Sequence, residues 1–207
     1  MSSSKKYLAI AFLFLAFSGA SVMMFYIYLG TRAELVHATT LPAPMALPEF
    51  SLLDHTGEAF TRDDFRDRWN IVFFGFTHCP DICPATLQQL AIAKSRLAEA
   101  GEEFPQIILI SVDPERDSPE VMAAYVGNFG ADIKGITGDL QELTKLTGAM
   151  GIFFARSGES GDGGGDYSVD HSAFVLLIDE SADWHSLFSA PHNIDSFVND
   201  LPILMAN

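Results

Sequence analysis

The sequence predicts an α/β domain that follows an N-terminal membrane anchor, and three observations support this prediction. Residues 7–29 form an apolar run without a charged residue. After residue 49, apolar runs of strand length alternate with segments of helical periodicity. The chain has only 2 cysteines among 207 residues, so its core has to be stabilised by apolar burial and not by a set of disulfides.

The apolar run at residues 7–29 is long enough to cross a bilayer as one helix. Lys5 and Lys6 precede it, so we expect residues 1–6 in the cytoplasm and the rest on the periplasmic side of a bacterial inner membrane, or its equivalent. A cleaved signal peptide is the alternative, with Ser18-Gly19-Ala20 as the cleavage site. The apolar run continues well past that tripeptide, which favours a retained single-pass anchor.

The part of the chain after the anchor divides into a linker and a domain. We expect residues 30–48 to be a linker, because their three prolines (Pro42, Pro44 and Pro48) favour extended backbone and disfavour helix. The domain, residues 49–207, begins with a predicted hairpin in which two short strands flank residues 55–58.

Within the domain, strands and helices are expected to alternate. The predicted strands cover residues 69–76, 107–112, 173–178 and 184–188, and the predicted helices cover residues 83–100, 119–129, 139–147 and 194–204, the last interrupted or ended near Pro202. This order, with the hairpin added at its start, is that of a thioredoxin-like fold. The Gly-rich segment at residues 157–166 is predicted to be a loop.

The charge of the chain is strongly acidic and unevenly distributed. The net charge is −15, and all 27 acidic residues follow Arg32. Such a domain repels nucleic acid and anionic lipid, so we expect no nucleic-acid partner. A basic partner surface or a cation is compatible with it, although solubility alone also explains the composition.

The two cysteines, Cys79 and Cys83, are the main candidates for chemistry. They follow the first central strand, at the edge where open α/β sheets place their sites. Thiols at positions i and i+4 project from one face of a helix turn, close enough for a disulfide or for one soft metal ion. Peptide dipoles at a helix N-terminus favour the thiolate, which is both the nucleophile and the metal ligand. Thiolates favour Cu(I), or zinc if two further ligands are present.

His171 is the expected third ligand. It precedes the third apolar strand, in a loop that faces the cysteines in a thioredoxin-like fold, and no proline lies within residues 157–190 to take the place of the usual cis-proline. Two sulfurs and one nitrogen would form a trigonal site suited to Cu(I), whereas Cu(II) would take further ligands from water or a carboxylate. The other histidines are expected to be solvated or structural: His37, His55, His78, His185 and His192. Residues 113–117 are expected to form a turn and cap a helix, or to lie at the rim of the site.

The sequence resembles the Sco/SenC family over about residues 48–204, together with the anchor. The resemblance rests on three motifs in order: Gly75-Phe-Thr-His-Cys-Pro-Asp-Ile-Cys-Pro84, Ser111-Val-Asp-Pro-Glu-Arg-Asp117 and Val169-Asp-His-Ser172. It implies a membrane-tethered, thioredoxin-like domain that binds copper through Cys79, Cys83 and His171. It also implies a role in building the dinuclear copper centre of cytochrome c oxidase subunit II. Relative to the usual family pattern, residues 157–166 look like an insertion.

Two functions remain open at this point. The first is a copper chaperone for subunit II or a similar oxidase subunit, with other copper chaperones or thioredoxin-like reductases as further partners. The second is a thiol–disulfide oxidoreductase that reduces the client's cysteines, which needs Cys79 and Cys83 but not His171. A peroxidase is less favoured, because no arginine lies between Arg68 and Arg96 to activate a thiolate locally.

Overall fold

The computed structural model describes residues 12, 14, 17–24, 35–158 and 167–206 and divides the chain into two compact units, Met1–Glu34 and Leu35–Asn207. In the first unit, residues 17–24 are helical. No helix among the described residues has the length and apolar character needed to cross a bilayer. Most of the expected span at 7–29 lies outside the described residues, as does most of the Gly-rich segment.

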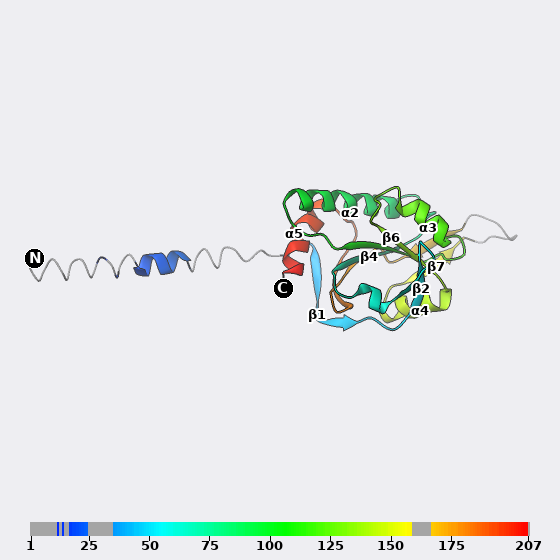
Figure 1. Cartoon of the computed structure of the whole chain (residues 1–207), viewed down its shortest axis with the longest axis horizontal. Helices are drawn as coiled ribbons and strands as arrows, with labels where there is room; N and C mark the ends of the chain where they lie inside the picture. The colour runs from blue at the N-terminus through cyan, green and yellow to red at the C-terminus, as the bar shows by residue number, and fades with distance from the viewer. Residues whose placement is uncertain (1–11, 13, 15–16, 25–34, 159–166, 207) are drawn as a thin grey trace, which may run out of the picture. The chain divides into compact units, whose positions relative to one another are not determined.

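The second unit is built around an eight-stranded mixed sheet (Figure 1). Its centre consists of three parallel strands, β4 (Asn70–Gly75), β5 (Gln106–Ser111) and β6 (Lys134–Thr137). Antiparallel strands extend it beyond β4, in the order β9 (Val175–Ile178), β10 (Asp183–Phe188) and β1 (Ala38–Ala46). Beyond β6 it is extended by β2 (Ser51–Asp54) and β3 (Ala59–Thr61), which form the expected N-terminal hairpin.

Helices cover both faces of this sheet (Figure 1). Helices α2 (Ile82–Glu99) and α5 (Ile194–Met205) pack against each other on one face, and α4 (Leu140–Ala149) lies on the other. Helix α3 (Pro119–Val126) packs on β6, and a short 3-10 helix, η1 (Arg62–Phe65), follows β3. Every residue of β4 is buried, which explains its continuous run of Ile, Val and Phe between two helical layers. The expected thioredoxin-like order is therefore present, with β6 as a central strand that the sequence did not reveal.

Two more strands, β7 (Phe154–Ser157) and β8 (Ser168–His171), form a separate two-stranded antiparallel sheet. Phe154 is paired with His171, and the Ser172 N–H donates to the Phe153 carbonyl at 2.9 Å. The expectation that His171 lies in a loop is therefore wrong, because it is the last residue of a strand. Neither strand is an apolar run, so neither carries the sequence signal of a buried strand.

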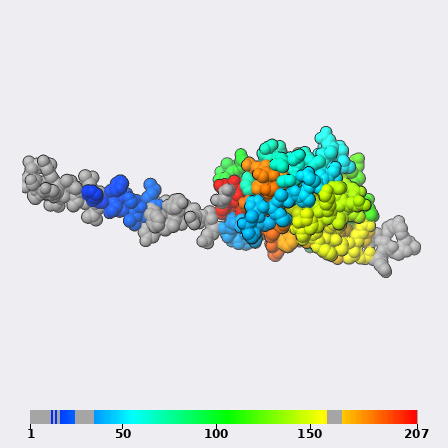
Figure 2. Space-filling view, turned by 90° about the horizontal axis from the view of Figure 1, so that it is seen from below, coloured from blue at the N-terminus to red at the C-terminus, as the bar shows by residue number. Residues whose placement is uncertain are grey.

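Strand β1 differs from the expected linker at residues 30–48. Residues 38–46 are extended, as their prolines predict, but they pair with β10 at the edge of the main sheet and lie on the molecular surface (Figure 2). An edge strand tolerates proline because one side of its backbone needs no ladder partner. The compact unit therefore begins at Leu35 and not at residue 49.

The last helix also differs from expectation in one respect. Helix α5 runs from Ile194 to Met205 and contains Pro202 within it, whereas the sequence suggested an interruption or an end near that proline. Asn193 is its N-cap, with a side chain that accepts a hydrogen bond from the Ser196 N–H at 2.8 Å. The apolar face of the helix, with Phe197, Leu201 and Leu204, is buried against the core.

Candidate metal centre

The two cysteines lie where β4 ends and α2 begins. Cys79 belongs to the loop before the helix, and its N–H donates to the Phe76 carbonyl at 3.2 Å. Cys83 is the second residue of α2 and is fully buried, whereas Cys79 is partly exposed. The expectation that both thiols project from one helix turn is thus only half right, because the N-cap Asp81 separates Cys79 from the helix.

The Cys79 sulfur accepts hydrogen bonds from backbone N–H groups at the start of α2, as a capping side chain would. The Asp81 side chain makes no capping hydrogen bond. Hydrogen bonds from the Cys83 thiol and from the backbone of Asp81 and Cys83 lower the pKa of Cys79 to about 5. The hydrogen bond to Cys79, together with burial, raises the pKa of Cys83 well above its ordinary value. The pair therefore holds one thiolate, on Cys79, and one thiol, on Cys83.

His171 reaches this pair from β8. Its ring makes edge contacts with Phe73 and Phe76, at centroid distances of 6.0 Å and 5.9 Å. Its Nδ1 lies 3.2 Å from the Ser172 carbonyl oxygen, to which an Nδ1–H can donate. That tautomer leaves the lone pair of Nε2 free, and Nε2 lies 3.6 Å from the Cys83 Sγ. The imidazole is therefore oriented as a ligand would be.

The three expected ligands meet at one point although His171 lies 88 residues from Cys83. The two sulfurs and a ring nitrogen all lie within 4.8 Å of one another. Thiolate and imidazole ligands at about 2.0–2.3 Å from one ion lie roughly 3.5–4 Å apart in a trigonal arrangement, so small side-chain movements suffice. Two soft sulfurs and one nitrogen fit Cu(I), and no carboxylate joins this grouping among the described residues.

The structure keeps the remaining histidines out of this group, as expected. The His78 side chain is 54% exposed, and its Nδ1 lies 3.0 Å from the Thr77 hydroxyl and 3.9 Å from an Asp117 oxygen. The others have separate surroundings: the backbone N–H of His37 donates to Asp200, the His55 ring accepts from the Gly135 N–H, the His185 ring packs on Trp69, and the His192 ring contacts the Ala173 carbonyl.

Gly75, the last residue of β4, makes room for Cys83. A Cβ at this position would lie 2.9 Å from the Cys83 Sγ and 2.9 Å from a ring carbon of Phe73. Both distances are shorter than any normal contact, so only glycine lets the thiol occupy its observed place. Its position directly before the cysteine loop was the only sequence signal for this role.

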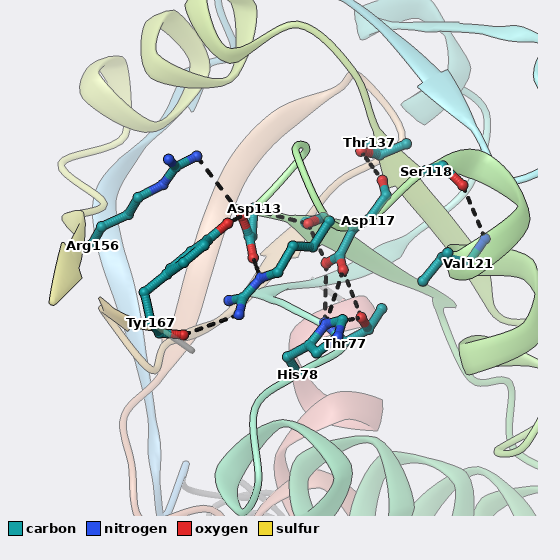
Figure 3. Close-up of polar contacts among 11 residues, drawn as sticks. Thr77, His78, Asp113, Asp117, Ser118, Val121, Thr137, Arg156 and Tyr167 are labelled. Atoms are coloured by element: carbon teal, nitrogen blue, oxygen red, sulfur yellow. Dashed lines mark hydrogen bonds and ion pairs between the residues drawn. The ribbon is translucent and has the colours of Figure 1, made fainter. Parts of the chain in front are cut away.

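Asp117 is a site-building residue whose role sequence reasoning left open. It is fully buried, and its carboxylate accepts hydrogen bonds from the Thr77 N–H at 3.0 Å, the Thr77 hydroxyl at 2.6 Å and the Ser111 hydroxyl at 2.6 Å (Figure 3). It thereby fixes the loop two residues before Cys79. The N-cap of α3 is Ser118, the residue after this segment, whose side chain accepts a hydrogen bond from the Val121 N–H.

Comparison with known proteins finds a family and several relatives. The SCO1/SenC family model matches residues 38–206. A Stutzerimonas stutzeri protein that is named for proposed copper binding is 35% identical, over 81% of this chain and 80% of its own length. A human mitochondrial SCO2 homologue is 40% identical over 63% of this chain, and the match covers 48% of the human protein. The chain thus spans about half the length of that relative.

Solved structures extend the comparison to the fold. Arabidopsis thaliana ScoI with copper bound superposes with a TM-score of 0.70 at 31% identity, over 77% of this chain and 98% of the other. Yeast Sco1 with copper bound gives a TM-score of 0.71 at 30% identity, over 76% of this chain and 87% of the other. The fold, the motifs and the family match agree, and the chain therefore belongs to the SCO1/SenC family.

Proposed function

We propose that this protein is a copper chaperone that binds one copper ion through Cys79, Cys83 and His171. The observation that carries the proposal is the meeting of two sulfurs and an imidazole nitrogen within 4.8 Å. The similarity to two structures solved with copper bound supports copper over zinc as the cargo. The donor set favours Cu(I), and Cu(II) would need a further ligand from water or a carboxylate.

The two cysteines have different tasks in this proposal. Cys79 is the more exposed ligand and already carries the thiolate, so it makes the first contact with an incoming ion. Cys83 has to lose its proton on binding, which couples copper uptake to proton release. Transfer to a client proceeds by exchange of these ligands for those of the client. A disulfide between the cysteines would block loading, so the dithiol state is required.

The client, from the family resemblance, is subunit II of cytochrome c oxidase or a similar copper-containing oxidase subunit. We propose that residues 7–29 anchor the chain in the inner membrane and that the domain from Leu35 onward lies on the periplasmic side. Anchoring would confine the domain to the membrane that holds its client, which raises the effective concentration of the two proteins.

A copper titration tests the proposal. The reduced full chain, purified in detergent, would be loaded with Cu(I) without oxygen, beside His171→Ala, Cys83→Ser and the control His185→Ala. His185 packs on Trp69, which precedes β4, whereas the cysteines follow β4, so this control removes an imidazole from the other end of the strand. We expect one copper per chain in the parent and control, and much weaker binding in the other two variants. Binding indifferent to His171 would exclude the three-ligand site.

Thiol–disulfide exchange is the second candidate function, and the asymmetry of the pair favours it. A partly exposed thiolate on Cys79 can attack a client disulfide, forming a mixed disulfide and releasing one client thiolate. Cys83 then gives its proton to the released client thiolate and attacks the Cys79 sulfur, which releases the second client thiolate and leaves Cys79–Cys83 oxidised. A thiol reductant, such as a thioredoxin-like reductase, has to regenerate the dithiol. His171→Ala distinguishes the two functions, because exchange would survive it.

A further inference from the structure

Tyr167 lies directly before β8, four residues before His171, and is held by three contacts. Its hydroxyl donates to the fully buried Asp113 at 2.6 Å (Figure 3). Its carbonyl accepts from Arg116 Nη1 at 3.0 Å, and the Arg116 guanidinium carbon lies 3.7 Å from its ring centroid. Arg116 also forms an ion pair with Asp113. The start of β8 is thus attached to the segment that follows β5.

The second attachment of this region comes from β7. Arg156 lies over the Tyr167 ring at 4.8 Å and forms an ion pair with Glu115 at 2.7 Å. Both strands of the small sheet are therefore joined through side chains to residues 113–117.

The same segment holds the cysteine loop. Asp117 accepts hydrogen bonds from the backbone N–H and the hydroxyl of Thr77, two residues before Cys79. Residues 113–117 thus contact the loop that carries the cysteines through Asp117, and the strand that carries His171 through Asp113 and Arg116 (Figure 3). We call residues 113–117 the bracket.

The bracket matters because, among the strands that the structure describes, β7 and β8 pair only with each other. An isolated two-stranded sheet is marginally stable and carries no ladder that would fix it to the main sheet. The position of His171 relative to the cysteines then depends on side-chain attachments. Partners of this kind, which do not touch the metal, commonly change metal affinity 10–100-fold when removed.

We propose that the bracket sets the position of His171 relative to Cys79 and Cys83, with Tyr167 as the positioning residue on the histidine side. This inference rests on the proposed function, since it concerns the same three ligands. The contacts of Tyr167 described above are with Asp113, Arg116 and Arg156 and not with the three ligands, so its effect is through the placement of β8.

The test compares Tyr167→Phe and Tyr167→Ala with the parent and with Tyr125→Phe, using the full chain in detergent. Tyr167→Phe removes the hydrogen bond to Asp113 but keeps the ring that contacts the guanidinium groups of Arg116 and Arg156. Tyr125→Phe is the matched control, because its buried hydroxyl makes no hydrogen bond to any described residue. Three quantities are measured: Cu(I) affinity by competition with a chelator, the absorption and electron paramagnetic resonance spectra of the Cu(II) form, and the apo-protein Tm.

We expect Cu(I) affinity to fall about 10-fold in Tyr167→Phe and further in Tyr167→Ala, and to be unchanged in Tyr125→Phe. The Cu(II) spectra of Tyr167→Ala should move toward those of His171→Ala, which a general loss of stability would not cause. Parental affinity and spectra in both Tyr167 variants would overturn the proposed role of the bracket and leave the proposed function intact. A lower Tm with parental spectra would also overturn that role. Failure of the parent to bind copper would overturn the proposed function and the bracket together.

Discussion

At the scale of single residues, the two sulfurs of the site are chemically unequal. Cys79 lies before the helix, where backbone N–H groups and the Cys83 thiol hydrogen-bond its sulfur, whereas Cys83 is enclosed by core side chains. The same spacing in an unstructured peptide would give two equivalent thiols. In the proposed function Cys79 reacts first and Cys83 second. This order follows from Cys79 lying outside the helix and Cys83 lying within it.

Alkylation measures this inequality. Because the pKa of Cys79 is lowered to about 5, its thiolate predominates above pH 5 and is lost below it. At pH 6 we expect iodoacetamide to modify Cys79 about tenfold faster than free cysteine, after allowing for the lower nucleophilicity of a less basic thiolate. Cys83 should stay unmodified in the folded protein. The rate of Cys79 alkylation plotted against pH should have its inflection near the pKa of Cys79. Cys83→Ala removes the largest cause of the lowered pKa, so in this variant the inflection should move to higher pH. An inflection near pH 8–9 in the parent would contradict the assignment.

Gly75→Ala tests the packing behind Cys83. The added Cβ would lie 2.9 Å from the Cys83 Sγ, so the sulfur has to move. We expect destabilisation by about 1–3 kcal/mol in urea unfolding, and copper affinity about 10-fold weaker. The control is Gly148→Ala in α4, where a Cβ meets nothing within 4 Å and helix propensity favours alanine. Unchanged copper affinity in Gly75→Ala would show that the site adapts to the added carbon.

At the scale of elements, the ends of the domain are joined by a buried carboxylate. Asp200 of α5 is fully buried and accepts hydrogen bonds from the N–H groups of Val36, His37 and Ala38 at 3.0, 2.8 and 2.7 Å. These groups lie at the start of the edge strand β1. One side chain thus attaches the first strand to the last helix.

Asp200→Ala should separate these two elements. It leaves three N–H groups without their acceptor, and we expect the free energy of unfolding to fall by about 2–4 kcal/mol in urea. Hydrogen exchange in β1 should accelerate. Asp195→Ala in the same helix is the control: its side chain is 76% exposed and pairs with Arg96, so the expected change is about 0.5 kcal/mol or less. Equal effects of the two substitutions would argue against the role of Asp200.

At the scale of the whole molecule, the chain divides into an N-terminal unit that ends at Glu34 and a compact domain that begins at Leu35. The domain includes the whole main sheet, the small sheet and the three proposed ligands, so we expect it to fold and to bind copper without residues 1–34. The proposed anchor then affects location and not chemistry.

Two truncations test this division. A chain of residues 35–207 should move from the membrane fraction to the soluble fraction and keep its copper stoichiometry and Tm. A chain of residues 40–207 lacks the three N–H donors to Asp200, so it should be less stable by about 2–4 kcal/mol in urea unfolding. Equal stability of the two chains would mean that the domain begins later than the structure indicates. A soluble full-length chain would rule out the proposed anchor.

Much of the architecture was predictable because its signals are local. The fully buried β4 and the apolar strands β5 and β9 are continuous apolar runs, and α2 has helical spacing. Strands β1, β7 and β8 were not predicted, because edge strands and small sheets have mixed exposure and, in β1, prolines. The central strand β6 was not predicted either, because its four residues, Lys-Gly-Ile-Thr, form no apolar run. The three proposed ligands were predicted from residue type and order, with the resemblance in support.

By itself, the sequence determined which residues bring sulfur and imidazole to the site, since donor chemistry is a property of the side chains. Only the tertiary structure decided how these groups differ and what holds them in place. Whether Cys79 is a thiolate depends on the hydrogen bond from the Cys83 thiol and on the backbone N–H groups around it. The place of His171 depends on contacts between segments far apart in the chain, such as Tyr167 with Asp113 and Asp117 with Thr77. Such contacts exist only after the chain has folded, because they depend on distances in space that sequence spacing does not encode.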